Sequence, residues 1–453
     1  MTRPRLSALV ASVLLVGGVT TAATAAPAAA ATRSCVHAGS GTADNLWLGG
    51  DGDWSDTTHW SLGAAPGPDG REYVCIPDDV AVALDSGRVD VQAFELGRGS
   101  SLTLAEGTAL YTWGGAAAES LTRKGSLVVV RGASLGGPGR LHVIGTVQVS
   151  NTTDTQARLS GEGGAGLMLV GDDGTLDVSG SYGDVRLTGG YSLDVRGRVR
   201  LLGDAGLLAD AGTQLALGTH LADDGVGRLV IRDDRGFFSS DLTAPSRLVN
   251  RGRIVKLDSE GNSAVSAAYS GGGETRVRSG YLVLPDAVAL PTAVAAGASV
   301  GSGTCADRRT CVTDTTAEEP QFASMTLPDQ GAGFTPVVVT ELTGERVPGG
   351  SVGDPVKVHA VGLTATRADP AVIELRYDRT LLESEARPFE SDALDVAHSS
   401  GGAYTTLPDC MAGGAIPSTS FACVDRRAGA SREDGNDVIM VVRTTRTSRW
   451  VIP

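Results

Sequence analysis

Acidic residues supply the first candidate chemistry in this 453-residue sequence, because two carboxylates can together cleave a glycosidic bond. Three Asp doublets are present, at Asp172-Asp173, Asp223-Asp224 and Asp233-Asp234. Glycoside hydrolysis needs two carboxylates that face each other about 5–9.5 Å apart. Each doublet lies beside a Gly or in a polar turn, where Asp side chains commonly bond the backbone. We therefore interpret the doublets as solvated turn residues and assign no catalytic residue.

Tryptophan supplies the second candidate chemistry, because indole rings can stack on a sugar. Trp47, Trp54 and Trp60 lie close together between residues 38 and 76, and we name them as candidate ligand-binding residues. The alternative interpretation is that the rings cover the end of a repetitive fold, since an open end would expose strand edges. We prefer the cap, because nothing else in this segment would hold a sugar.

The same segment holds three carboxylates that could bind a metal ion, at Asp51, Asp53 and Asp56. Calcium is the cofactor that such a loop would take, but it normally needs about six to eight oxygen ligands. Only these three are evident, so turn residues are the simpler explanation. No His lies beside a Cys pair at the spacing of a zinc site, and no other cofactor is predicted.

The six cysteines would favour disulfides in an exported protein, because an even number of cysteines is then typical of a disulfide framework. Six cysteines allow about fifteen pairings. We expect the sequence-local ones, since each pair then lies within one structural unit. The predicted pairs are Cys35 with Cys75, Cys305 with Cys311, and Cys410 with Cys423.

Short strands are the elements that must position the candidate residues. They are predicted because one sequence phrase recurs from about Gly125 to Leu284. In this phrase a Gly precedes apolar residues that alternate with polar ones, as in Gly174-Thr-Leu176-Asp177-Val178. Alternation with a period of two predicts a strand with one buried face, and the Gly gives the backbone freedom to turn. Leu176 should therefore be buried and Asp177 should face solvent. Many such strands at similar intervals predict a solenoid.

Longer strands with wider spacing are predicted after residue 320, at 334–342, 356–361, 372–377 and 438–442. They favour an antiparallel β-sandwich of ordinary domain size. The predicted organisation is a signal peptide at 1–31, a Trp-rich cap at 32–79, a parallel β-helix at 80–290, a linker with a small disulfide loop at 291–320, and a β-sandwich at 321–453.

Several phrases resemble those of secreted bacterial β-helix proteins. The segment from Trp47 to Trp60 resembles their opening module, and Asn250-Arg-Gly252-Arg-Ile254 resembles the coils of pectin-lyase-like right-handed β-helices and adhesin passengers. The segment around Cys410 and Cys423 resembles their closing β-sandwich. The resemblance implies an all-β fold, with a right-handed parallel β-helix followed by a small antiparallel β-sandwich.

The same resemblance should bring catalytic motifs if it brings catalytic activity. A polygalacturonase would show Asn-Thr-Asp, Gly-His-Gly and Arg-Ile-Lys phrases. This sequence has only the near misses Asn151-Thr-Thr-Asp154 and Arg253-Ile-Val-Lys256, and it lacks Gly-His-Gly. We therefore predict no pectinolytic site.

The N-terminus indicates where the protein is located, and the charge balance indicates which partners it disfavours. Two arginines, the apolar run from Leu6 to Val19 and small residues up to Ala31 are typical of a secretory signal peptide. No other apolar stretch approaches the ~20 residues of a membrane span. The 38 basic and 52 acidic residues give a net charge of −14, which disfavours nucleic acid as a partner.

These observations predict a secreted, extracellular and non-catalytic protein that is structural, adhesive or glycan-binding. The β-helix would be a rigid scaffold, and the partner would be an extracellular glycan or a cell-surface component. The alternative is a polysaccharide-degrading hydrolase or lyase with its site on the lateral face of the β-helix. A row of exposed aromatic residues beside converging carboxylates in a lateral groove would favour that enzyme. Flat polar faces and a covered end would favour the non-catalytic protein.

Overall fold

The chain is almost entirely β-structure. A computed structural model places one α-helix, α1 (Arg379–Ser384), and three 3-10 turns, η2 (Thr57–His59), η3 (Ser391–Ala393) and η4 (Ala412–Gly414), in the part of the chain that it describes. No helix in that part is long and apolar enough to cross a membrane. The predicted signal peptide lies outside it. The described residues are 36–37, 41–42, 44–67, 69, 72–116, 118–180, 183–218, 226–232, 234–241, 244–257, 261–285, 291–302, 321–329, 333–342, 347, 351–384, 390–400, 403–427, 430–434 and 436–453.

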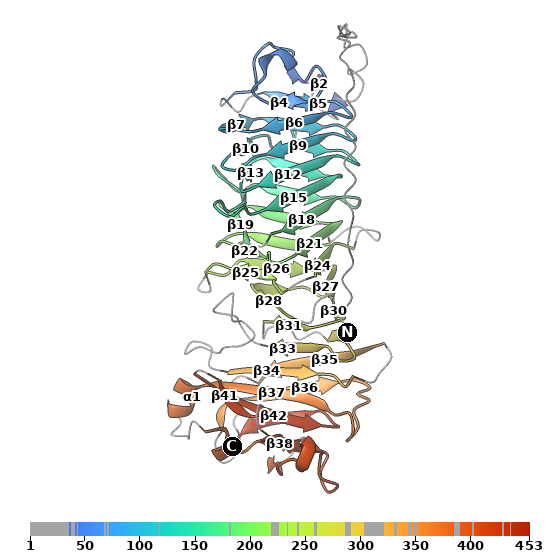
Figure 1. Cartoon of the computed structure of the whole chain (residues 1–453), viewed down its shortest axis with the longest axis vertical. Helices are drawn as coiled ribbons and strands as arrows, with labels where there is room; N and C mark the ends of the chain where they lie inside the picture. The colour runs from blue at the N-terminus through green and yellow to red at the C-terminus, as the bar shows by residue number, and fades with distance from the viewer. Residues whose placement is uncertain are drawn as a thin grey trace, which may run out of the picture.

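Most of the strands belong to three long sheets. Within each sheet, the strands follow one another along the length of the molecule (Figure 1). From β5 to β29 the chain visits the three sheets in a fixed order, so that each strand from β5 to β26 pairs with the strand three places later. All of these pairings are parallel, as in Thr175↔Arg198 and Ser192↔Gln214. The arrangement is compatible with the predicted β-helix, and we call this region the parallel stack.

The bounds of the strands in the parallel stack are as follows. Sheet 1 contains β4 (Gly52–Asp53), β6 (Ala81–Leu84), β9 (Ser101–Leu104), β12 (Leu127–Arg131), β15 (Thr146–Ser150), β18 (Thr175–Ser179), β21 (Arg198–Leu202), β24 (Arg228–Ile231), β27 (Arg253–Lys256), β30 (Glu274–Val277) and β32 (Thr292–Ala295). Sheet 2 contains β7 (Arg88–Val91), β10 (Ala109–Thr112), β13 (Ser134–Gly136), β16 (Arg158–Ser160), β19 (Val185–Thr188), β22 (Leu207–Ala209), β25 (Phe237–Ser239), β28 (Asn262–Ser266), β31 (Tyr281–Leu284) and β33 (Ser299–Ser302). Sheet 3 contains β3 (Asn45–Leu46), β5 (Tyr73–Ile76), β8 (Ala93–Leu96), β11 (Ser120–Thr122), β14 (Arg140–Val143), β17 (Leu167–Val170), β20 (Ser192–Val195), β23 (Gln214–Leu217), β26 (Arg247–Asn250) and β29 (Ala268–Ser270).

Alternation of apolar residues builds the interior of this stack. Leu176 and Val178 in β18 are fully buried, and Leu176 lies between Val147 and Val199 of the neighbouring strands. Similar side chains stacked in register bury a continuous apolar column, which is how a solenoid stabilises its coils. The recurrent phrase at 174–178 coincides with β18, so it is a strand, as predicted.

The glycine of the recurrent phrase has a second role besides turning. At Gly227, which precedes β24, a Cβ atom would lie only 1.9 Å from the backbone oxygen of Val195. Real side chains never approach a backbone atom so closely, so this position requires the absence of a side chain. The glycine lets one coil lie directly against the coil before it.

Two of the three sheets continue past the parallel stack without a break. β32 and β33 still pair in parallel with β30 and β31, so the parallel pattern reaches residue 302, inside the predicted linker. The next strands to join, β35 (Phe334–Glu341) and β34 (Gln321–Thr326), pair antiparallel with β32 and β33. We call everything from residue 321 onward the antiparallel region.

The antiparallel region extends sheets 1 and 2 with strands from distant parts of the sequence. Sheet 1 gains β36 (Val352–Ala360), β43 (Ser448–Ile452), β38 (Ala397–Ser399) and β39 (Thr405–Thr406), and sheet 2 gains β37 (Ala371–Asp378), β42 (Asp437–Thr444), β40 (Ala422–Val424) and β41 (Arg432–Asp434). A separate antiparallel pair, β1 (Val36–His37) with β2 (Gly41–Thr42), lies near the N-terminal end. One buried apolar cluster runs from Trp47 to Ile452 and joins both regions.

Candidate functional site

The three tryptophans of the N-terminal segment are packed against one another at the end of the stack. Trp60 lies edge to face with Trp47 and with Trp54, at 4.9 Å between ring centroids in each case. All three side chains are buried, at no more than 2% exposed. Their faces are therefore closed to a sugar, which argues against a stacking platform here. The packing fits the preferred interpretation of an end cap.

Two of the three carboxylates of the same segment accept hydrogen bonds from the backbone around them. Asp56 accepts a hydrogen bond from the Thr58 N–H at 2.9 Å, at the start of η2. Asp51 accepts one from the Ala81 N–H at 2.8 Å, and Asp53 is exposed in β4. Across the described ranges, no three His, Cys, Asp or Glu side chains are placed to hold a metal ion. The calcium hypothesis therefore has no ligand set in that part of the chain.

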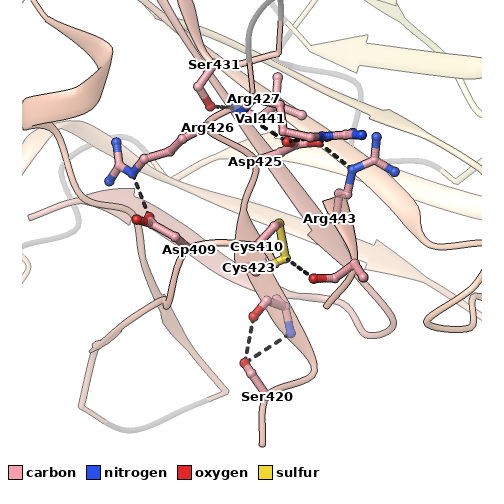
Figure 2. Close-up of a disulfide and its surroundings, with 12 residues drawn as sticks. Asp409, Cys410, Ser420, Cys423, Asp425, Arg426, Arg427, Ser431, Val441 and Arg443 are labelled. Atoms are coloured by element: carbon pink, nitrogen blue, oxygen red, sulfur yellow. Dashed lines mark hydrogen bonds and ion pairs between the residues drawn. A yellow bond between two sulfur atoms is a disulfide. The ribbon is translucent and has the colours of Figure 1, made fainter. Parts of the chain in front are cut away.

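One predicted disulfide is placed in full. Cys410 and Cys423 are bonded, with 4.9 Å between their Cα atoms, beside a group of arginines and aspartates (Figure 2). Cys75 is also disulfide-bonded, and its partner lies outside the described residues. The predictions for the remaining cysteines concern residues outside the described part, namely Cys35, Cys305 and Cys311.

The doublet Asp172-Asp173 lies in an exposed turn, as predicted. It lines a hollow of about 320 Å³ together with Arg196, Arg198 and Arg228. Asp173 also forms an exposed ion pair with Lys124, at 3.1 Å between Nζ and Oδ2. Cations therefore surround this doublet. The other two doublets lie outside the described residues, apart from Asp234.

A different group of residues combines an exposed aromatic ring with fixed charges, on the outer face of sheet 2. Trp113 directly follows β10 and is 42% exposed, whereas the other four tryptophans are buried. Its indole N–H donates a hydrogen bond to Asp90 Oδ1 at 2.9 Å. Asp90 lies in β7, beside Tyr111 of β10. The ring is thereby held in one orientation at the surface.

Arg88 ties two carboxylates together beside this ring. Its Nε donates to Asp90 Oδ2 at 2.7 Å, and its Nη1 donates to Glu162 Oε1 at 2.6 Å. The guanidinium also lies over the Tyr111 ring, at 4.6 Å from the centroid. Glu162 comes from the turn after β16, and β13 lies between β10 and β16 in the sheet, so the group spans four consecutive coils. We call Arg88, Asp90, Tyr111, Trp113 and Glu162 the Trp113 site.

The electrostatics of the Trp113 site keep both acids ionised. Burial alone would raise the pKa of Asp90, but the hydrogen bonds from Arg88 and Trp113 outweigh it and the pKa is lowered. Hydrogen bonds from Arg88 and Tyr111 lower the pKa of Glu162. A glycosidase needs one carboxylic acid that is protonated at its working pH. Neither acid of this site meets that requirement at neutral pH.

The chemistry that remains available to the Trp113 site is recognition of a polar ligand with an apolar face. An indole that is already fixed loses little entropy when a ligand packs on it, and sugars present such faces. Arg88 supplies N–H donors, while Asp90 and Glu162 supply acceptors for hydroxyl groups. The arrangement is therefore suited to binding such a ligand.

Sequence reasoning missed the Trp113 site, although one signal was present. Aromatic residues make up only 4% of the chain, and Trp113 is the tryptophan that falls within the predicted β-helix at 80–290. The partners Asp90 and Glu162 lie far from it in sequence, and the register that joins them is not readable in advance. No protein-family model matches this chain, and neither a curated protein nor a solved structure is found to match it.

Proposed function

We propose that this is a secreted, non-catalytic glycan-binding protein that presents its binding surface on a rigid scaffold. The Trp113 site carries the proposal, because it combines an exposed, fixed indole with ionised hydrogen-bonding groups. The lowered pKa values of Asp90 and Glu162 favour binding over the alternative of a polysaccharide hydrolase at this site. Secretion rests on the signal-peptide pattern of residues 1–31.

The scaffold in this proposal is a right-handed parallel β-helix of the pectin-lyase-like or adhesin-passenger-like kind, followed by a small β-sandwich. Support comes from the regular return to the same sheet after every third strand. The single buried cluster from Trp47 to Ile452 would make this scaffold stiff along its length. The proposed units are the cap at 32–79, a stack beginning at 80, and the sandwich at 321–453.

The burial of the other four tryptophans makes a direct test practicable. Acrylamide should quench the fluorescence of Trp113 selectively, because the remaining indoles are shielded from solvent. The mature protein would first be screened on a glycan array, and soluble oligosaccharides of each retained class would then be titrated. In the wild type, we expect a bound oligosaccharide to protect Trp113 from quenching by acrylamide. In Trp113→Ala, we expect array binding to fall by at least tenfold.

Phe334→Ala is the matched control, because Phe334 is a second exposed aromatic residue on another part of the surface. Array binding should be unchanged in this variant. The proposal would be wrong if no glycan class were retained by the wild type, or if Trp113→Ala bound as well as Phe334→Ala.

A further inference from the structure

A larger hollow lies where the parallel stack passes into the antiparallel region. Its volume is about 600 Å³, within the usual range for small-molecule sites. Strands β31, β33, β34, β37 and β41 all contribute to its lining. The residues that matter for its chemistry are Arg278, Tyr281, Ser299, Thr326, Arg376 and Arg432. We call this hollow the junction hollow.

Glycine makes room for the aromatic side of the junction hollow. A Cβ atom at Gly301 would lie 2.5 Å from the hydroxyl oxygen of Tyr281 and 2.7 Å from the Phe322 ring. The bare backbone of β33 thus lets the Tyr281 ring lie across it, edge to face with Phe322 at 6.2 Å. Burial raises the pKa of the Tyr281 hydroxyl well above its usual value, so this group stays neutral.

Three guanidinium groups give the junction hollow its cationic character. The Arg376 side chain is only 4% exposed and is held by Asp437 at 3.0 Å and by Glu374 at 3.2 Å. Arg432 lies two strands from Arg376 in the same row of the sheet, because both face Ile439 of β42.

The third cation, Arg278, is exposed, and its side chain makes no hydrogen bond or ion pair within the described residues. Three arginines and one carboxylate, Glu374, line the hollow, so arginines outnumber acidic residues in its lining. This excess is notable in a chain whose net charge is −14.

Hydroxyl groups line the same hollow. Ser299 and Thr326 are cross-strand partners whose side-chain oxygens lie 2.7 Å apart. Such groups both donate and accept hydrogen bonds. A small inorganic anion would accept hydrogen bonds from the arginines and the hydroxyl groups, but it would leave the Tyr281 ring uncovered. A ligand with a negative group on a hydroxylated, ring-shaped body would use all three.

We propose that the junction hollow binds an anionic sugar, one that carries a carboxylate or a sulfate group. Arginine suits both groups, because its planar fork can donate two parallel hydrogen bonds to either. Arg278 is the residue free to close on the anionic group, while Arg376 is already fixed by its two carboxylates. The site goes beyond the Trp113 site and does not depend on it, since β10 and β33 lie far apart along the molecule (Figure 1).

The test is isothermal titration of the mature protein with three disaccharides of similar size. One carries a glucuronate, one carries a glucuronate and a sulfate, and the third is neutral cellobiose. We expect saturable binding of at least one anionic disaccharide and no detectable binding of cellobiose. Raising the salt concentration should weaken the binding, because the contacts at the rim are screened.

Two variants locate the binding. Arg278→Ala should weaken it by at least tenfold, and Ala296→Glu should do the same by placing a negative charge in the lining. Arg131→Ala, an exposed arginine in β12 remote from the hollow, should have no effect. Trp113→Ala should also leave it unchanged, which separates this site from the proposed glycan platform. Equal binding of cellobiose, no saturable binding of either anionic sugar, or full binding by Arg278→Ala would overturn the proposal.

Discussion

The parallel stack and the antiparallel region share one apolar core but are held together differently. In the stack, each strand pairs with a strand about one coil away, as Leu176 does with Val199. In the antiparallel region, strands from distant parts of the chain pair, as Val356 does with Trp450. The stack therefore repeats one kind of strand pairing from coil to coil. In the antiparallel region, each strand pairing depends on its own pair of sequence segments.

Buried charges follow the same division. In the stack, Asp177 pairs with Arg200 directly opposite on the next strand, at 2.6 Å between Oδ1 and Nε. In the antiparallel region, Asp425 accepts hydrogen bonds from Arg427 and Arg443, which join a loop to a strand (Figure 2). In the stack, the ion pair joins equivalent positions of neighbouring coils. In the antiparallel region, the ion pairs hold together segments that are not repeats of one another.

The largest expected effect comes from breaking the apolar column of the stack. Leu176→Asp places an unpaired charge at a fully buried position. Truncation of a buried Leu to Ala already costs roughly 2–5 kcal/mol, and burying a charge adds to that cost. We expect the free energy of unfolding to fall by at least about 3 kcal/mol, measured by urea denaturation with circular dichroism.

Asp177→Asn is the control within the same strand. It keeps the size of the side chain and removes only the charge that faces Arg200, so a loss of about 1 kcal/mol is expected. If both variants lost the same stability, the inward and outward faces of β18 would be wrongly assigned.

The sequence predicted the inward face of β18 but not the state of its outer face. Period-two alternation shows which side of a strand is buried, because it is a property of the strand alone. Asp177 was expected to face solvent, yet its side chain is only 6% exposed because Arg200 covers it. That contact depends on the register between coils. The same limit applies to β12, where four successive apolar residues, Leu127 to Val130, do not reveal that Val128 and Val130 point inward.

The next expected effect tests how closely the coils approach. Gly227→Ala would push a methyl group into the backbone oxygen of Val195. Overpacking of this kind typically costs about 1–3 kcal/mol. Gly272→Ala is the matched control, because a Cβ atom there meets nothing within 4 Å. Thermal unfolding should show a lower midpoint temperature for Gly227→Ala and an unchanged one for Gly272→Ala. Equal decreases in the two variants would contradict the close approach of the coils.

The candidate sites were less predictable than the fold. The Trp-rich segment was recognised, but burial decides whether an indole can bind a sugar, and burial depends on neighbours that the sequence does not place. The Trp113 site needs β7, β10 and the turn after β16 in register. The junction hollow needs β33 and β34 to meet, and these pair antiparallel across a change of architecture. Both sites are formed by residues from several strands, so neither can be predicted from the pattern of a single strand.

The smallest expected effect concerns the charge network of the antiparallel region. Hydrogen bonds from Arg427 and then Arg443 lower the pKa of Asp425, against the effect of its burial. A carboxyl group whose pKa is lower in the folded state stabilises the fold fully above its unfolded pKa of about 3.9. This contribution is lost as the pH falls from that value through the folded pKa.

Asp425→Asn should therefore lower the free energy of unfolding at pH 7 by only about 1–2 kcal/mol, because both arginines remain partly exposed to solvent. Below about pH 4 the wild type should lose stability more steeply than the variant, so that the two urea midpoints converge as the pH falls. Asp409→Asn is the control, since the Asp409 side chain is exposed where it pairs with Arg426. Its stability should follow that of the wild type across the same pH range. A constant gap between wild type and Asp425→Asn from pH 7 to pH 2 would mean that the charge of Asp425 does not hold this region together.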